Sequence, residues 1–171
     1  MKHSEWAWVP MAAICTSAFA TTYFTTEQAQ QAIFPGEQLT PAFVTLTDEQ
    51  AGKIAGITGL KVPRKSIKVW KAAQGGWFFL DEVIGKHESI NYAVGLNADG
   101  SVRRIEILDY RESYGFEVRS PAWREQFVGK TTADPVSLND DIRNISGATL
   151  SAKHIAEGVK RVLATYAVVL K

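Results

Sequence analysis

Residues 89–110 read SINYAVGLNADGSVRRIEILDY, a pattern typical of two β-strands joined by a tight turn. Ala98-Asp99-Gly100 marks the turn, because aspartate and glycine tolerate the backbone angles that hairpins require. Apolar side chains alternate along the first strand, as in a sheet that places one face on a core: Ile90, Tyr92, Val94 and Leu96. The stretch therefore predicts an antiparallel hairpin.

A second hairpin is expected just before this one. SIKVWKAA (66–73) and GWFFLDEVI (76–84) flank the turn residues Gln74-Gly75-Gly76. The two hairpins together predict an antiparallel sheet of about four strands at the centre of the chain.

The C-terminal region has a helical period instead. The stretch from residue 145 reads ISGATLSAKHIAEGVKRVL. Within it and after it, apolar residues recur at spacings of three and four. We expect a helix from about Ser151 to Leu170 that packs one apolar stripe on the sheet: Ile155, Val159, Val162, Leu163, Tyr166 and Leu170. The predicted fold class is α+β, an antiparallel sheet packed against helices that include this long C-terminal one.

Three shorter helices are expected as well. The first begins after Thr25 or Thr26 and stops at Pro35-Gly36, and the second begins at Thr47 or Asp48 and ends near Gly59. Pro121 opens the third, PAWREQF, which stops at Gly129.

Length and charge limit the class of protein. A chain of 171 residues with 46% hydrophobic residues builds one compact core, and we expect residues 21–171 to form a single domain. The 19 basic and 18 acidic residues leave a net charge of +1 without long runs of one sign, which argues against nucleic acid as a partner.

The N-terminal segment has the features of an export signal. Lys2 precedes a mainly apolar stretch that ends in Ala18-Phe19-Ala20, and we expect residues 1–20 to be a signal peptide cleaved after Ala20. The alternative is an uncleaved N-terminal anchor from Trp6 to Phe24, which Pro10 disfavours. The only cysteine, Cys15, lies in this segment, so a mature chain would contain no disulfide or thiolate site.

Conventional catalytic and metal-binding patterns are missing from the sequence. His3, His87 and His154 have no metal-ligand spacing, and no nucleophile elbow, Walker A loop or dinucleotide-binding glycine pattern occurs. Gly85-Lys86-His87-Glu88 between two predicted strands is either a plain turn or the lining of a ligand cleft.

Four small residues precede the C-terminal helix: Ser146, Gly147, Ala148 and Thr149. One interpretation is purely structural, with Gly147 relaxing the backbone and Thr149 or Ser151 capping the helix. The other is a phosphate site, since a helix N-terminus presents unpaired amides and the positive end of the dipole. Lys153 lies one turn into this helix, where it either pairs with the phosphate or is an ordinary solvated lysine.

These four residues resemble the Ser/Thr-Gly-Ala-Thr/Ser signature of the FMN-binding domain that occurs in the Rnf complex and in the sodium-translocating NADH:quinone oxidoreductase. Leu150-Ser151 also fits the family, as do WREQFVGK (123–130), the loop from Glu112 to Gly115 and the hairpin that ends at Tyr110. The resemblance covers about residues 75–165. Two departures are Arg143, where the family usually has aspartate, and Ser113-Tyr114-Gly115, where the members in these two complexes have Thr-Pro-Gly.

The resemblance implies FMN as cofactor, attached through a phosphoester to Thr149 by a flavin transferase. It places the cofactor-binding site at Ser146, Gly147, Ala148, Thr149, Leu150, Ser151, Glu112, Gly115 and Lys130, and to these we add Lys153 and His87.

The implied role is that of an exported electron carrier rather than a stand-alone enzyme. It would act in the periplasm or at the outer face of the cytoplasmic membrane, between a quinone- or cytochrome-linked membrane donor and an unknown acceptor. The alternative is a non-covalent FMN-binding module without an electron-relay role.

Overall fold

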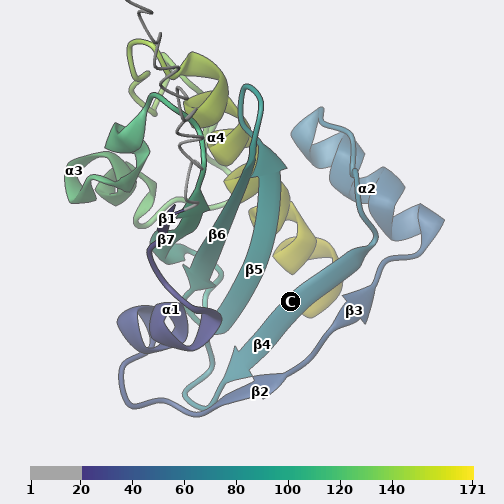
Figure 1. Cartoon of the computed structure of the whole chain (residues 1–171). Coiled ribbons are helices and arrows are strands. Elements are labelled where there is room, and N and C mark those ends of the chain that lie inside the picture. The colour runs from purple at the N-terminus through teal and green to yellow at the C-terminus, as the bar shows by residue number, and fades with distance from the viewer. Residues whose placement is uncertain (1–20) are drawn as a thin grey trace, which may run out of the picture.

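The computed structural model describes residues 21–171, and the predicted leader, residues 1–20, lies outside the described residues. The sheet is antiparallel and its strand order is β1-β7-β6-β5-β4-β2, with β3 also pairing with β4 (Figure 1). The four long strands are those expected from the two hairpins: β4 (Ser66–Ala72), β5 (Trp77–Ile84), β6 (Ser89–Leu96) and β7 (Val102–Tyr110). Three strands of two or three residues were not predicted: β1 (Thr21–Thr22), β2 (Leu39–Pro41) and β3 (Val44–Thr45).

The two hairpins have the turns that their glycines predict. Gly75 and Gly100 adopt φ angles of 101° and 86°, which side chains with a Cβ atom rarely tolerate. Across the sheet, Val94 of β6 pairs with Phe79 of β5 and with Ile105 of β7, and all three side chains are buried.

The C-terminal helix covers one face of this sheet. It is α4 (Thr149–Thr165), continued by a π-helical stretch (Tyr166–Leu170), so it starts two residues earlier than expected. The expected stripe is confirmed: Ile155, Val159, Val162, Leu163 and Tyr166 are buried, and the partly buried Leu170 packs against the same cluster.

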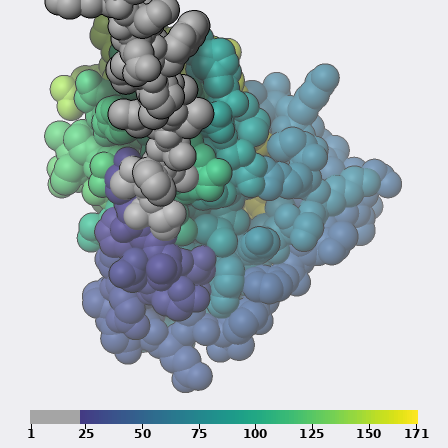
Figure 2. All heavy atoms as spheres, in the orientation of Figure 1, coloured from purple at the N-terminus to yellow at the C-terminus, as the bar shows by residue number. Residues whose placement is uncertain are grey.

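Part of the opposite face of the sheet is buried too, which corrects the expectation of a single core face. α1 (Thr26–Ile33) packs against part of it, over β6 and β7, and Figure 2 shows the purple N-terminal segment on part of the near side of the molecule. A Cβ atom on Gly95 would overlap the Ile33 side chain, so the small residue in β6 permits close approach of the helix. The second cluster comprises Ala29, Ile33, Phe34, Ala72, Phe78, Ala93 and Leu108.

The shorter helices begin as their sequences predict. Thr25 and Thr47 cap α1 and α2 (Asp48–Thr58) through capping boxes, and Gly59 ends α2 in a left-handed conformation. α3 (Pro121–Arg124) lies between two 3₁₀ turns and contributes Trp123 to the main core. No helix among residues 21–171 is long and apolar enough to cross a membrane.

Candidate functional site

The backbone turns sharply into α4 at the four small residues. Gly147 has a φ angle of 80°, and Ala148 is the N-cap, so neither Thr149 nor Ser151 caps the helix as the structural interpretation expected. The first amide to bond into the helix is that of Ala152, which donates to the Ala148 carbonyl at 3.0 Å. Within residues 21–171, the amides of Thr149, Leu150 and Ser151 have no hydrogen-bond acceptor. The helix start therefore presents three free donors and the positive end of its dipole.

Thr149 is exposed at this helix start, and its hydroxyl is held by one neighbour. The Asn144 side-chain amide donates to Thr149 Oγ1 at 3.2 Å, while Asn144 Oδ1 accepts from the Ile145 amide at 2.8 Å. Because Oγ1 acts as acceptor in this contact, the hydroxyl proton of Thr149 points elsewhere.

The loop after β7 packs directly on the helix start. A Cβ atom on Gly115 would overlap the Cβ atom of Ala148, and the φ angle of Gly115 is 89°. The Tyr110 hydroxyl donates to the Tyr114 carbonyl at 2.5 Å and is also hydrogen-bonded, at 3.3 Å, to Oγ of the buried Ser151. Burial of the Tyr110 phenol raises its pKa.

Glu112 fastens the same loop to the turn between β5 and β6. Its Oε1 accepts from the amides of His87 at 2.6 Å and Glu88 at 3.1 Å. Gly85 makes this approach possible, since a Cβ atom there would lie 2.5 Å from Glu112 Oε1. Burial disfavours the ionised carboxylate, but the backbone hydrogen bonds outweigh it and the pKa of Glu112 is lowered. Glu112 thus holds the turn between β5 and β6. The sequence predicted Glu112 only as a cofactor-binding residue and did not predict this structural role.

These segments enclose a cleft at the N-terminus of α4, which we call the α4 cleft. Its volume is about 480 Å³, within the roughly 300–1,000 Å³ of small-molecule and cofactor sites. The segment Gly85-Lys86-His87-Glu88 therefore forms a turn and also contributes to the lining of the cleft, so both alternatives given for it apply. The α4 cleft is lined by Lys86, His87, Glu112, Ser113, Tyr114, Gly147, Ala148, Thr149, Leu150 and Ser151.

Four expected site residues do not line the α4 cleft. Ser146 is exposed beside the turn, and Gly115 lies behind Ala148. The Lys153 ammonium is 3.8 Å from Glu157, and its side chain lines a second cavity of about 320 Å³ that shares Thr149 with the α4 cleft. The fourth is Lys130.

Lys130 supports the loop that leads to the four small residues. Its ammonium lies 2.8 Å from Asp141 Oδ2 and 3.9 Å from Asp134. Asp141 also accepts from the amides of Ser137 and Val136, and Val136 has a φ angle of 45°. Positive φ is unusual for a β-branched residue, so these contacts hold a strained backbone. The spacing of Lys130 from Asp141 in the sequence carries no signal of this pairing.

Three lining residues belong to segments that the sequence analysis named but were not among its individual cofactor-binding residues: Lys86, Ser113 and Tyr114. Each is next to an expected residue, because Lys86 precedes His87 and the other two lie between Glu112 and Gly115. The sequence therefore predicted which segments line the cleft better than it predicted the individual residues.

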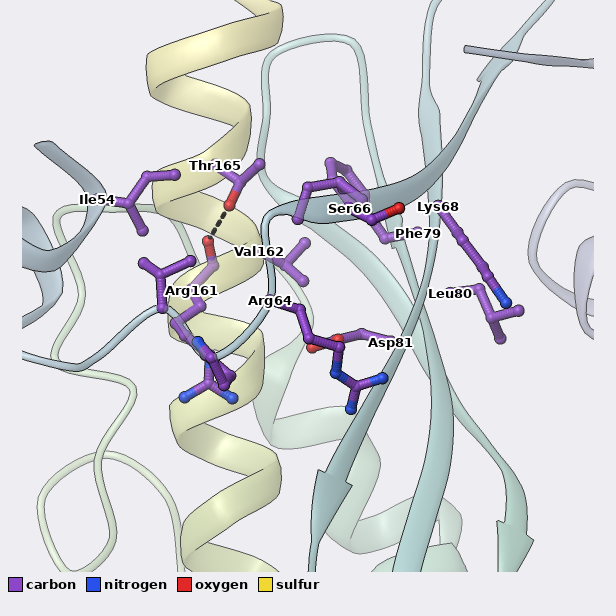
Figure 3. Close-up of a pocket in the computed structure, with 13 residues that line it drawn as sticks. Ile54, Arg64, Ser66, Lys68, Phe79, Leu80, Asp81, Arg161, Val162 and Thr165 are labelled. Carbon is purple, nitrogen blue, oxygen red and sulfur yellow. Dashed lines mark hydrogen bonds between the residues drawn. The ribbon is translucent and has the colours of Figure 1, made fainter. Parts of the chain in front are cut away.

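A further cavity lies between α4 and strands β4 and β5 (Figure 3). It is lined by Val162 and Thr165 of α4 and by Ser66 and Phe79 of the sheet, with Arg64 and Arg161 also among its residues. Its volume of about 50 Å³ is too small for a cofactor, and it contains none of the expected site residues.

Comparison with known families identifies the segment that builds the α4 cleft. Residues 85–164 match the model of the FMN-binding domain, and this range includes every residue that lines the cleft. The match is to the family as a whole, without distinguishing the members found in the Rnf complex or the quinone oxidoreductase. No curated protein matches the chain. The free amides, the exposed hydroxyl and the cleft volume fit a flavin mononucleotide, and residues 85–164 belong to the FMN-binding domain family with FMN as cofactor.

Proposed function

We propose that this protein is an exported flavoprotein that carries FMN in the α4 cleft as a phosphoester on Thr149 and relays electrons. The observation that supports it most is the start of α4. Three free amides, of Thr149, Leu150 and Ser151, lie at the start of the helix, and all three residues line a cleft of cofactor size.

The electrostatics of the helix start favour a phosphate there. Backbone amides and the helix dipole stabilise an anion by about 0.3–1 kcal/mol at an exposed helix end. Lys86 also lines the cleft, and Lys153 follows one turn into the helix. Gly147 and Ala148 have so little side chain that a phosphate and its attached chain can approach the backbone.

Attachment to Thr149 would be a phosphoryl transfer from an activated flavin nucleotide, a pyrophosphate of FMN, catalysed by a flavin transferase. Oγ1 of Thr149 forms a bond to the FMN phosphorus while the pyrophosphate P–O bond breaks. The other nucleotide leaves with the electron pair, and the hydroxyl proton passes to a base of the transferase or to water. The chain gains the mass of FMN less one water.

Electron relay is the role that suits this arrangement. Bound FMN supplies reversible redox chemistry, whereas the protein sets its position and solvent access. A bond to the protein prevents loss of the cofactor outside the cytoplasm, where free flavin is scarce. We propose that the protein acts in the periplasm or at the outer face of the cytoplasmic membrane, between a quinone- or cytochrome-linked membrane donor and a separate acceptor.

The proposal is tested by co-expression with a flavin transferase. The wild-type chain should gain the mass of FMN less one water and fluoresce on a denaturing gel. Thr149→Val should abolish the adduct and leave the fold intact, because valine has nearly the same shape and Thr149 does not cap the helix. Ser146→Ala is the matched control and should keep the adduct. A wild-type chain that never gains mass would overturn the covalent assignment.

Arg143 favours a second candidate, a module that holds FMN without a bond. The family usually has aspartate at this position, and here the Arg143 amide donates to Gln126 Oε1 at 2.9 Å while its carbonyl accepts from Trp123 at 2.8 Å. Nε of the exposed Arg143 side chain also donates to Gln126 Oε1, at 3.3 Å, so Arg143→Asp should lose this contact and keep the two backbone bonds. Modification of Arg143→Asp but not of the wild type would favour the non-covalent module.

A further inference from the structure

Tyr114 is the most exposed large apolar side chain at the α4 cleft. Its exposed fraction is 76%, compared with 43% for Leu150 on the other side. Exposure on this scale costs hydrophobic free energy unless another surface covers the ring. The Tyr114 side chain thus lines the cleft and is largely exposed.

The backbone beneath this ring is held firmly. The Tyr114 carbonyl accepts from the Tyr110 hydroxyl at 2.5 Å. The next residue, Gly115, packs against Ala148, immediately before the Thr149 hydroxyl. The ring of Tyr114 and the proposed attachment oxygen are therefore carried by two segments that pack closely against each other.

Other aromatic side chains nearby are engaged with one another. Phe116, 51% exposed, packs on Tyr110 with ring centroids 5.7 Å apart. In the part of the chain that the structure describes, Tyr114 takes part in no aromatic pair and its hydroxyl makes no hydrogen bond. Nothing in residues 21–171 accounts for an aromatic ring at this position.

We propose that the Tyr114 ring packs against the isoalloxazine ring of FMN and positions it in the α4 cleft. This inference rests on the proposed function, since it requires FMN at Thr149 or free FMN in the same cleft. A flat, largely apolar ring system is the surface that an exposed phenol covers best, and aromatic contacts of this kind change affinity by about 2- to 10-fold. Tyr114 is thereby a positioning residue for the flavin ring, separate from the phosphate contacts of α4.

Flavin fluorescence tests this contact directly, because an electron-rich phenol against an oxidised flavin quenches its emission. Wild type, Tyr114→Ala and Tyr114→Phe are compared at equal flavin content, measured by mass and absorbance. Tyr114→Ala should brighten the flavin and lengthen its lifetime. Tyr114→Phe should keep the ring packing, seen as a wild-type near-ultraviolet and visible dichroism of the flavin, while relieving part of the quenching.

Phe116→Ala is the matched control, because that ring is exposed in the same loop but does not line the cleft. It should leave the flavin lifetime unchanged. Equal lifetimes in wild type and Tyr114→Ala, with flavin bound in both, would overturn the ring contact and leave the proposed function standing. If the wild type carries no covalent flavin, titration with free FMN gives the same comparison, with about 2- to 10-fold weaker binding expected for Tyr114→Ala. A wild type that binds no FMN in either form would overturn both.

Discussion

Gly115 packs so closely against Ala148 that a Cβ atom on residue 115 would overlap the Cβ atom of Ala148. This contact joins the loop after β7 to the turn before α4, and the two segments form adjoining walls of the α4 cleft. A small residue is therefore required on each side of the contact, and the cleft depends on both.

Gly115→Ala should destabilise the protein and impair FMN loading. The substitution meets two penalties, a φ angle of 89° and the overlap with Ala148, and we expect a loss of about 2–4 kcal/mol in the free energy of unfolding. Gly129→Ala separates them, because Gly129 has a φ angle of 80° but nothing within 4 Å of its added Cβ atom. Urea unfolding of both variants measures the difference. Equal losses would show that the contact with Ala148 contributes nothing.

Asn144→Ala should slow attachment of FMN without unfolding the protein. The side-chain amide of Asn144 orients Thr149 Oγ1 through a hydrogen bond of 3.2 Å. If this hydrogen bond lowers the activation free energy of attachment by about 1 kcal/mol, its loss corresponds to a roughly 5-fold lower rate. A mass-spectrometric time course with the transferase gives this rate. Asn97→Ala removes a comparable amide bond in the distant β6–β7 hairpin and should leave the rate unchanged. Unchanged attachment in Asn144→Ala would mean that Asn144 does not orient the hydroxyl.

The Lys130–Asp141 pair should make stability pH-dependent at both extremes. The hydrogen bond to Asp141 raises the pKa of Lys130 above 10.5. Burial of Asp141 opposes ionisation, but the bonds from Lys130, Ser137 and Val136 outweigh it and lower its pKa below 3.8. The stability that ionised Asp141 contributes is present above pH 3.8 and is lost as the pH falls through its lowered pKa. The stability that protonated Lys130 contributes is present below pH 10.5 and is lost as the pH rises through its raised pKa.

Asp141→Asn should therefore cost about 1–3 kcal/mol near neutral pH and flatten the loss of stability in acid. Urea unfolding at several pH values measures both effects. Asp140→Asn changes the neighbouring exposed carboxylate and serves as control, with a shift within about 0.5 kcal/mol. An Asp141→Asn variant with the acid profile of the wild type would contradict the assignment of this pair.

Val159→Asp should cost at least about 3 kcal/mol in the free energy of unfolding, because it places an unpaired charge in the main core. Lys160→Asp is the control one residue along the same helix. Lys160 is only partly buried and lies beside the second cavity, so its replacement should cost less than about 1 kcal/mol. Thermal unfolding of the two variants distinguishes the buried stripe of α4 from its outer side, and equal shifts would contradict it.

The local elements of this protein were predictable because their signals are local. A hairpin needs only alternation and a turn glycine, as at Gly100, and a helix start needs only a capping side chain, as at Thr25 and Thr47. The four small residues at Ser146 to Thr149 likewise indicated the helix start and, through the family resemblance, FMN. The strands of two or three residues escaped prediction because they are too short to show a period.

The tertiary structure decided what these elements face. Small residues in β6 such as Gly95 leave room for a second layer, but only the folded chain shows that Ile33 of α1 fills it. Glu112 and Lys130 also have polar side chains that suit a cofactor. Packing directs Glu112, at the wall of the α4 cleft, to the amides of His87 and Glu88, and it directs Lys130 to Asp141. A carboxylate or an ammonium group pairs with whichever hydrogen-bond partner the fold brings within reach. For residues far apart in the chain, the sheet and α4 set that distance. The sequence around either residue does not.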